Sequence, residues 1–212
     1  MPINVAIVED RKETLEGLKS MVDSSDELFC CGTFENAQSF TDKFKHLQVD
    51  VVLMDIDMKP GISGIECVAN LHESRPDVQF MMCTHLEDAD NIYEALKVGA
   101  NGYIVKNTTP DKMVAAIKEI HSGGSPMSSQ IARKVTAAFK QDRQNSEQVD
   151  SLTQLEKDTV DLLSKGYPYK EIAEKHDVSI DTIRKRIRNI YIKLQVQNKT
   201  DAINKLYPRT KS

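Results

Sequence analysis

The sequence has no long apolar run, no internal repeat and no paired-cysteine motif. A membrane-spanning helix needs about 18–20 consecutive apolar residues, and no stretch of the chain approaches that length. At the N-terminus, MPINVAIVED places a short apolar stretch before two acidic residues, which predicts a strand and not a secretory signal peptide. These absences predict a cytoplasmic protein with no membrane partner.

Cysteine is also scarce. The four cysteines, Cys30, Cys31, Cys67 and Cys83, form no CxxC pair and have no histidines at the spacing of a metal site. This pattern lacks the usual signature of a structural zinc site. We therefore expect reduced thiols, most of them packed in the core.

The net charge of the 212-residue chain is only −4, but its distribution is uneven. Residues 1–123 hold 21 acidic and 11 basic residues, a net charge of −10, whereas residues 151–212 hold 8 acidic and 13 basic residues, a net charge of +5. Residues 124–150, with 3 acidic and 4 basic residues, carry a net charge of +1. A basic tail behind an acidic first half is expected when only the tail meets a polyanion. The alternative is that the charged residues are unevenly distributed by chance.

Short apolar runs alternate with amphipathic segments through residues 1–121. The apolar runs predict five strands, at Val5–Val8, Phe29–Phe34, Val51–Asp55, Phe80–Thr84 and Tyr103–Val105. The segments between and after them predict five helices, at Lys12–Met21, Ala37–Lys45, Gly64–Ser74, Ala89–Val98 and Pro110–His121, the last capped by Thr109. This alternation predicts an α/β fold with a doubly wound, five-stranded parallel sheet.

The pattern breaks at HSGGSP, residues 121–126. We expect a helix at Ile131–Lys140 and a flexible polar linker at Gln141–Asp150, which has one apolar residue in ten. Thr153 and Glu156 fit a capping box that opens a helix ending near Gly166. Three further helices are predicted at Tyr169–His176, Ile180–Leu194 and Thr200–Leu206. The expected organisation is a domain at 1–123, a linker with a helix at 124–150, and a small all-α domain at 151–212.

Charged and hydroxyl side chains follow or end four of the predicted strands. They are Glu9, Asp10, Asp55, Thr84 and Lys106. Because the carboxyl ends of parallel strands meet at one edge, these side chains should converge. Three converging carboxylates repel one another unless a cation lies between them, and oxygen ligands suit Mg²⁺. A carboxylate there can accept a phosphoryl group, with the lysine and the hydroxyl contacting the phosphoryl oxygens. The alternative is a set of solvated strand ends.

The segments VED, VVLMDIDMKPGISGIE, MMCTHLED and GYIVKNTTPDKM resemble the receiver domain of bacterial response regulators, which has a flavodoxin-like fold, over residues 3–121. The resemblance implies Asp55 as the phosphoacceptor. It implies Mg²⁺ held by Asp10, Asp55 and the backbone carbonyl of Asp57, with Glu9 acting mainly through water. The further implied residues are the switch hydroxyl Thr84, the phosphoryl-binding Lys106 and the switch aromatic Tyr103. A half-buried strand aromatic without a switching role is the alternative for Tyr103.

Three residues depart from the receiver pattern. The usual acceptor loop is Asp-x-x-Met-Pro-Gly, whereas DIDMKPG has Lys59 inserted before the proline. Asp57 adds an acid beside the acceptor, and His85 follows Thr84 where a small residue is usual. We hypothesise slower phosphorylation or an altered phosphate lifetime. For His85, a surface imidazole with no role is the alternative.

The helix predicted at Ile180–Leu194 has two distinct faces. On a helical wheel at about 100° per residue, Ile183, Ile187, Ile190 and Leu194 form an apolar stripe. Basic residues lie on the other side, with Arg186 and Lys193 flanking Arg184, Lys185 and Arg188. A solvated face is the common reason for such a charge run. Here, however, the helix follows another helix and the short turn Asp177–Ser179, as in a helix-turn-helix.

Residues 151–206 resemble the LuxR-type DNA-binding domain through LT..E, KEIA, VS..TI and KL.V.NKT.A. The resemblance implies that Arg184, Lys185 and Arg188 contact base edges. It implies phosphate contacts for Lys170, Thr182 and Arg186. In DNA complexes base contacts carry specificity, whereas phosphate contacts fix register.

The two resemblances together describe a NarL/FixJ-type response regulator. They imply that a histidine kinase phosphorylates Asp55 and that the chain then binds double-stranded DNA as a homodimer on paired half-sites. One alternative is a receiver-like regulator that binds DNA without phosphorylation. The other is a phosphatase, because Asp55 and Asp57 form a DxD motif after a strand.

Overall fold

A computed structural model describes residues 1–59, 61–85 and 88–207. The chain forms two compact units, Met1–Ala138 and a second that begins at Phe139. Each unit is described by itself below. Within the described residues, no helix combines the length and the apolarity that a membrane span requires.

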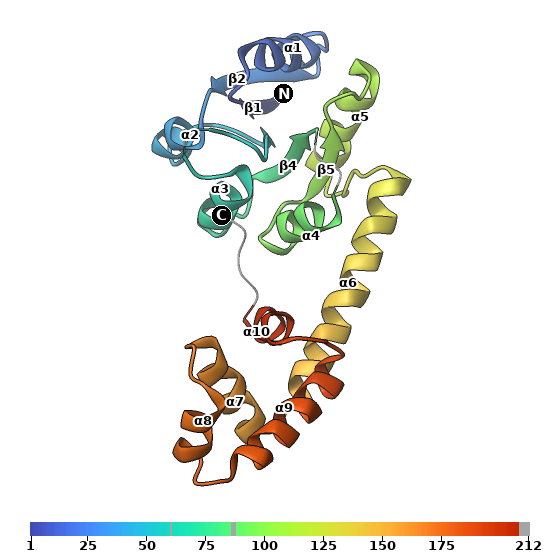
Figure 1. The fold of residues 1–212 in the computed structure, drawn as a ribbon. Coiled ribbons are helices and arrows are strands. Elements are labelled where there is room, and N and C mark those ends of the chain that lie inside the picture. Colours follow the sequence, from blue (N-terminus) through green and yellow to red (C-terminus); the bar gives the residue numbers. More distant parts are fainter. Residues whose placement is uncertain (60, 86–87, 208–212) are drawn as a thin grey trace. The chain divides into compact units, whose positions relative to one another are not determined.

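The first unit is built on five parallel strands in the order β2-β1-β3-β4-β5 (Figure 1). The strands are β1 (Ile3–Val8), β2 (Leu28–Phe34), β3 (Val51–Met54), β4 (Gln79–Thr84) and β5 (Gly102–Val105). The connecting elements are α1 (Lys12–Asp23), α2 (Ala37–Phe44), α3 (Gly64–Leu71) with η1 (His72–Ser74), α4 (Ala89–Lys97) and α5 (Pro110–His121). The predicted doubly wound, five-stranded parallel sheet is confirmed.

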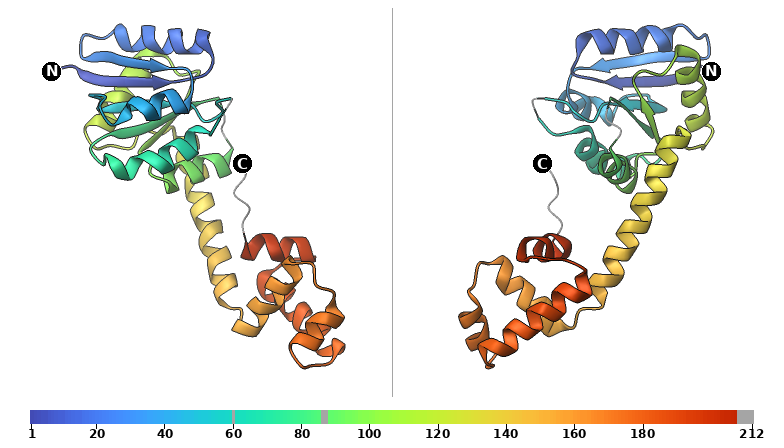
Figure 2. Two further views of the ribbon diagram at one scale, coloured as in Figure 1. Left: turned by 90° about the vertical axis from the view of Figure 1, so that its left-hand side faces the viewer. Right: turned by 45° about the vertical axis from the view of Figure 1, so that its right-hand side comes forward.

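Helices cover both faces of this sheet, as both views of Figure 2 show. Successive strand side chains point to opposite faces, so Val5 and Ile7 of β1 pack with α1 and α5, while Ala6 and Val8 pack with α2, α3 and α4. Burial on both faces explains why the strands are continuous apolar runs and not alternating ones.

Cys67 and Cys83 are buried, Cys30 and Cys31 are half-buried, and all four are free thiols. Burial raises the pKa of the Cys83 thiol to about 12, which makes it unreactive.

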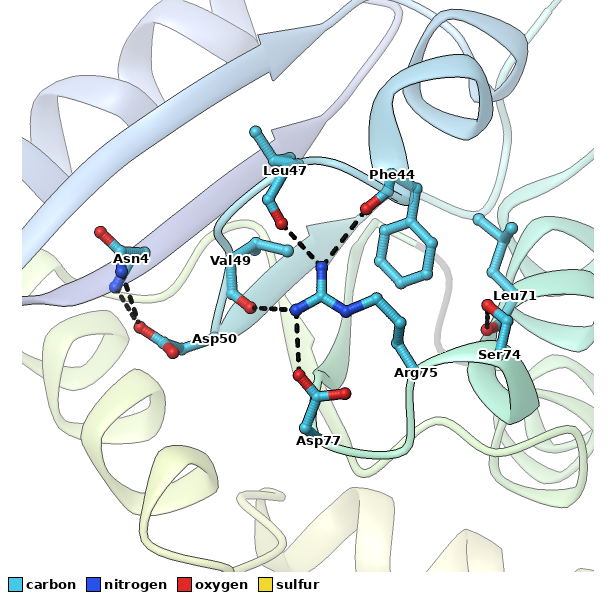
Figure 3. A network of polar contacts seen from close by, with 9 residues as sticks. All are labelled: Asn4, Phe44, Leu47, Val49, Asp50, Leu71, Ser74, Arg75 and Asp77. Carbon is cyan, nitrogen blue, oxygen red and sulfur yellow. Dashed lines mark hydrogen bonds and ion pairs between the residues drawn. The ribbon is translucent and has the colours of Figure 1, made fainter.

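A polar network lies beside the amino ends of the strands (Figure 3). Arg75 donates from Nη1 to the carbonyl oxygens of Leu47 at 2.6 Å and Phe44 at 3.3 Å, and its Nη2 pairs with Asp77 at 2.9 Å. These bonds satisfy carbonyl groups at the end of α2 and in the loop that leads to β3. The guanidinium therefore fixes the path of the chain into the strand that precedes Asp55.

The segment after α5 belongs to the first unit. Met127 forms a parallel bridge with Tyr103, and the backbone N–H of Tyr103 donates to the carbonyl of Pro126 at 3.1 Å. Four residues later Ile131, only 1% exposed, packs into the same core cluster as Tyr103. Residues past Gly123 thus pair with strand β5 and complete one face of the core.

Two local predictions in this region were wrong. Thr109 does precede α5, but its side chain makes no capping hydrogen bond. Gln141–Asp150, expected to be a flexible linker, is the second half of α6 (Ser129–Asp150). Its glutamines, arginine and glutamate are good helix formers, and the pair Arg143–Glu147, at 3.0 Å, has the spacing that supports a helix.

In the second unit, the residues described up to Tyr207 form four short helices after α6 (Figure 1). They are α7 (Gln154–Ser164), α8 (Tyr169–Lys175), α9 (Ile180–Leu194) and α10 (Lys199–Leu206). The predicted capping box of Thr153 and Glu156 opens α7. Ile183 and Ile187 of α9 pack with α8, and Ile190 and Leu194 pack with α7 and α10. The apolar stripe of α9 therefore forms the centre of the unit, as predicted.

Candidate functional site

The predicted acidic cluster forms at the carboxyl edge of the sheet. Glu9 follows β1, Asp55 follows β3, and Lys106 follows β5. Backbone hydrogen bonds continue the sheet ladder to two of these residues. The Asp55 N–H donates to the carbonyl of Val8 at 2.9 Å, and the Lys106 N–H donates to the carbonyl of Thr84 at 3.0 Å. Glu9, Asp55 and Thr84 are 0%, 4% and 1% exposed, respectively. The sheet thus buries two carboxylates and a hydroxyl together, and buried carboxylates require partners for their charges.

Lys106 is the partner of two of the carboxylates. Its Nζ lies 2.9 Å from Asp55 Oδ2, and it forms a second ion pair with Glu9 Oε2. Burial raises the pKa of Glu9, although the hydrogen bond from Lys106 acts in the opposite direction. Burial alone would lower the pKa of Lys106, but hydrogen bonds with Glu9 and Asp55 outweigh it and hold the pKa above its usual value. The lysine is therefore a cation in the folded protein.

Asp10 joins the cluster from the end of β1. Carboxylate oxygens of Glu9, Asp10 and Asp55 lie within 4.8 Å of one another. Asp10 Oδ1 is buried and has no hydrogen-bond partner among the described residues. One ammonium thus faces three carboxyl groups, and one oxygen is left unpaired. An all-oxygen set of this kind fits a hard divalent cation.

The loop after β3 is packed closely against Asp55, the predicted phosphoacceptor. The N–H of Ile56 donates to Asp55 Oδ1 at 2.8 Å, and the N–H of Gly64 donates to the Ile56 carbonyl at 3.0 Å. A Cβ at Gly64 would lie 1.8 Å from the Asp55 carbonyl oxygen, so only glycine allows α3 to begin there. We did not single out Gly64 from the sequence, because its role depends on this close approach.

The second candidate site is the basic face of α9. Arg184, Lys185 and Arg188 are exposed, whereas the four apolar residues of the opposite stripe are buried. Arg184 Nη1 pairs with Asp181 at 3.0 Å, across one helical turn. Among the described residues, the side chains of Lys185 and Arg188 form no hydrogen bond or ion pair. The helix therefore offers a cationic surface that is suited to an extended polyanion.

The remaining predicted contact residues lie on α8 and α9. Thr182 is exposed in the first turn of α9, where Ser179 caps the helix, and Lys170 is exposed on α8. Arg186 differs from them because it is half-buried and donates from Nη1 to Thr159 at 3.3 Å. Lys193 turns away from the basic face and binds Glu156 Oε2 at 2.6 Å and the Ser151 carbonyl at 3.2 Å. The sequence did not reveal that Lys193 joins α9 to the start of α7.

Comparisons with known proteins cover nearly the whole chain. Residues 5–118 match the family described as response regulator receiver domain, and residues 150–206 match bacterial regulatory proteins of the luxR family. The transcriptional regulatory protein LnrK of Bacillus subtilis is 33% identical over 208 residues, which cover 94% of each chain. This chain belongs to the response regulators.

Other relatives of this response regulator agree in length and fold. The response regulator protein VraR of Staphylococcus saprophyticus is 28% identical over 203 residues, which cover 96% of this chain and 95% of VraR. A structure of the RcsB response regulator of Salmonella typhimurium has a TM-score of 0.69 at 21% identity and covers 96% of this chain and 98% of the other. The chain is thus a two-domain response regulator with a receiver domain and a LuxR-type DNA-binding domain.

The receiver residues that depart from the usual pattern lie at the surface of this response regulator. The Asp57 side chain is 66% exposed and lies 3.9 Å from the Lys59 ammonium, and His85 is exposed. Tyr103, in contrast, is fully buried and not half-buried. The roles of Thr84 and Tyr103 in switching, and of the Asp57 carbonyl as a ligand, stay predictions.

Proposed function

We propose that Asp55 of this response regulator accepts a phosphoryl group from a histidine kinase, and that phosphorylation promotes DNA binding by the second unit. The observation that carries the proposal is the buried Lys106 ammonium shared by Asp55 and Glu9, beside the unpaired oxygen of Asp10. A charge-neutralised carboxylate next to a fixed cation is the arrangement that phosphoryl transfer to a side chain requires.

The chemistry proposed for the receiver is one displacement at phosphorus. A carboxylate oxygen of Asp55 forms a P–O bond as the P–N bond to the kinase histidine breaks, and the nitrogen leaves with the electron pair. Lys106, which pairs with Asp55, would donate to a phosphoryl oxygen, and Thr84, buried at the end of β4, would donate to another. Glu9, Asp10, Asp55 and the carbonyl of Asp57 would hold Mg²⁺, which neutralises charge on the transferred group when bound.

The receiver also has a contact through which switching could reach the linker. Tyr103 is fully buried in β5, and its N–H donates to the carbonyl of Pro126, three residues before α6 begins at Ser129. Ile131 of α6 packs in the same core cluster. We propose that rearrangement of Thr84 and Tyr103 after phosphorylation changes the packing at the start of α6.

The second unit is proposed to bind double-stranded DNA as a homodimer on paired half-sites. Arg184, Lys185 and Arg188 would contact base edges in the major groove. Phosphates would be contacted by Lys170, Thr182 and Arg186. RcsB, a protein of the same fold, has been solved in a complex with DNA, which supports this assignment.

The test is selection of bound DNA from a random library by the wild type and Asp55→Asn, each with and without a small acyl phosphate as phosphodonor. We expect the phosphodonor to increase DNA binding by the wild type alone, because the asparagine amide cannot form the acyl phosphate. Equal enhancement in both proteins would contradict phosphoacceptance at Asp55. Strong binding by the wild type that the phosphodonor does not change would favour a regulator that acts without phosphorylation.

A further inference from the structure

We propose that the backbone N–H of Lys59 positions Asp10 as a ligand for a divalent cation. Lys59 is the residue inserted in the acceptor loop, so the insertion would give this receiver a donor that the common loop pattern lacks. The inference rests on the cation site of the proposed function, and it assigns a role to a residue that neither touches the phosphoryl group nor binds the ion itself.

The first support is the geometry of Asp10. Its Oδ2 accepts a hydrogen bond from the Lys59 N–H at 3.1 Å, a contact between residues 49 positions apart. Its Oδ1 is buried with no hydrogen-bond partner among the described residues, and the Asp10 carboxylate belongs to the cluster formed with Glu9 and Asp55. One oxygen of the carboxylate is therefore fixed by the loop, and the other is left for a ligand.

The second support is that the backbone of Lys59, and not its side chain, makes this contact. The side chain is 83% exposed, and its ammonium lies 3.9 Å from the exposed carboxylate of Asp57. A backbone donor loses little side-chain entropy on binding, and a hydrogen bond to an ionised carboxylate is stronger than a neutral one. Such bonds orient metal-ligating carboxylates, and their loss typically lowers metal affinity by about 10- to 100-fold.

The third support is the position of the insertion in the sequence. The loop pattern Asp-x-x-Met-Pro-Gly has proline directly after methionine, whereas this chain has Lys59 there. Proline has no N–H, so a loop of the common pattern could not donate to Asp10 from this position. The added residue supplies the missing donor.

The experiment compares Mg²⁺ affinity of the full chain by isothermal titration calorimetry, without phosphodonor, for the wild type, Lys59→Pro and Lys59→Ala. The proline variant removes the N–H, and the alanine variant keeps it while removing the ammonium. We expect Lys59→Pro to bind Mg²⁺ about 10-fold more weakly and Lys59→Ala to stay within about twofold of the wild type. Equal affinities, tighter binding by the proline variant, or an equal loss in both variants would overturn the proposal.

A second measurement does not depend on the proline variant folding normally. Hydrogen exchange of the Lys59 amide should be slow in the wild type and faster in Asp10→Ala, because the acceptor is removed. Equal exchange rates would overturn the hydrogen bond. A wild type that binds no Mg²⁺ would overturn the cation site and this inference together, whereas Mg²⁺ binding without phosphorylation of Asp55 would overturn only the proposed phosphoacceptor.

Discussion

The receiver holds a cation at each edge of its sheet, and the two have different partners. At the amino edge, Arg75 binds one carboxylate and three backbone carbonyls, those of Phe44, Leu47 and Val49. At the carboxyl edge, Lys106, with a side chain only 3% exposed, pairs with two carboxylates and lies in a cluster that contains a third. At the amino edge, Arg75 and Asp77 balance each other's charge, whereas the cluster at the carboxyl edge keeps excess negative charge. Balanced groups stabilise the fold, and unbalanced groups are those available for a ligand.

The same contrast divides the basic residues of α9. Lys193 is engaged with Glu156 and a backbone carbonyl, so its charge is used within the unit. Lys185 and Arg188 are exposed and have no such partner among the described residues. Sequence alone shows both kinds of residue as one basic run, and only their contacts separate structural cations from those that can meet DNA.

The largest effect is expected from Lys106→Met, which removes the buried cation and leaves Glu9 and Asp55 facing each other. Breaking a buried ion pair on one side costs about 3–5 kcal/mol. We expect a loss of about this size in the free energy of unfolding, measured with urea, and partial recovery in Mg²⁺ because a bound cation replaces the missing charge. Full stability without Mg²⁺ would show that the two edges are not electrostatically different.

Arg75→Met tests the opposite edge. Loss of the guanidinium leaves partly buried carbonyls without donors, at about 1–3 kcal/mol for such a group, so we expect about 2 kcal/mol lower stability. Unlike the loss in Lys106→Met, this one should not recover in Mg²⁺, and phosphorylation of Asp55 should persist. Recovery by Mg²⁺ would contradict the separation of structural and functional charge in the receiver.

Arg184→Ala and Lys170→Ala compare base and phosphate contacts within the second unit. Arg184→Ala should cost about 1–3 kcal/mol of binding at one base pair and relax the sequence preference there. Lys170→Ala should weaken binding to all sequences equally and reduce the slope of log affinity against log salt concentration by about one. Fluorescence anisotropy with matched and mismatched duplexes at several salt concentrations measures both. An equal loss of affinity for matched and mismatched duplexes in Arg184→Ala would show that Arg184 contacts a phosphate and not a base.

The smallest effect is expected at Glu156, the engaged partner of Lys193. Burial opposes its charge, but hydrogen bonds from Lys193 and Thr153 outweigh burial and hold the pKa of Glu156 below its usual 4.5. The resulting stability is present above pH 4.5 and is lost as the pH falls through the lowered pKa. Glu156→Gln should therefore cost about 1 kcal/mol at pH 7 and progressively less below pH 4.5, by thermal unfolding. A difference that does not depend on pH would assign the loss to packing.

The carboxyl-edge cluster was predictable because it follows from a rule about parallel strands. Glu9, Asp55 and Lys106 each come directly after an apolar run, and the sheet order brings those ends together. The contact of Lys59 with Asp10 and the network of Arg75 depend on the paths of loops between distant elements, which residue spacing does not encode. The helical Gln141–Asp150 was missed because a polar composition was taken to mean flexibility, although the same residues have high helix propensity.

Strand β5 has a practical consequence for studying the receiver on its own. The domain boundary expected at Gly123 would remove Met127, which bridges to Tyr103, and Ile131, which fills the core. A fragment cut there would leave an open sheet edge, a template for pairing with another chain, and a cavity in the core. A fragment that ends at Ala138 keeps both contacts and should remain monomeric at concentrations where the shorter one aggregates.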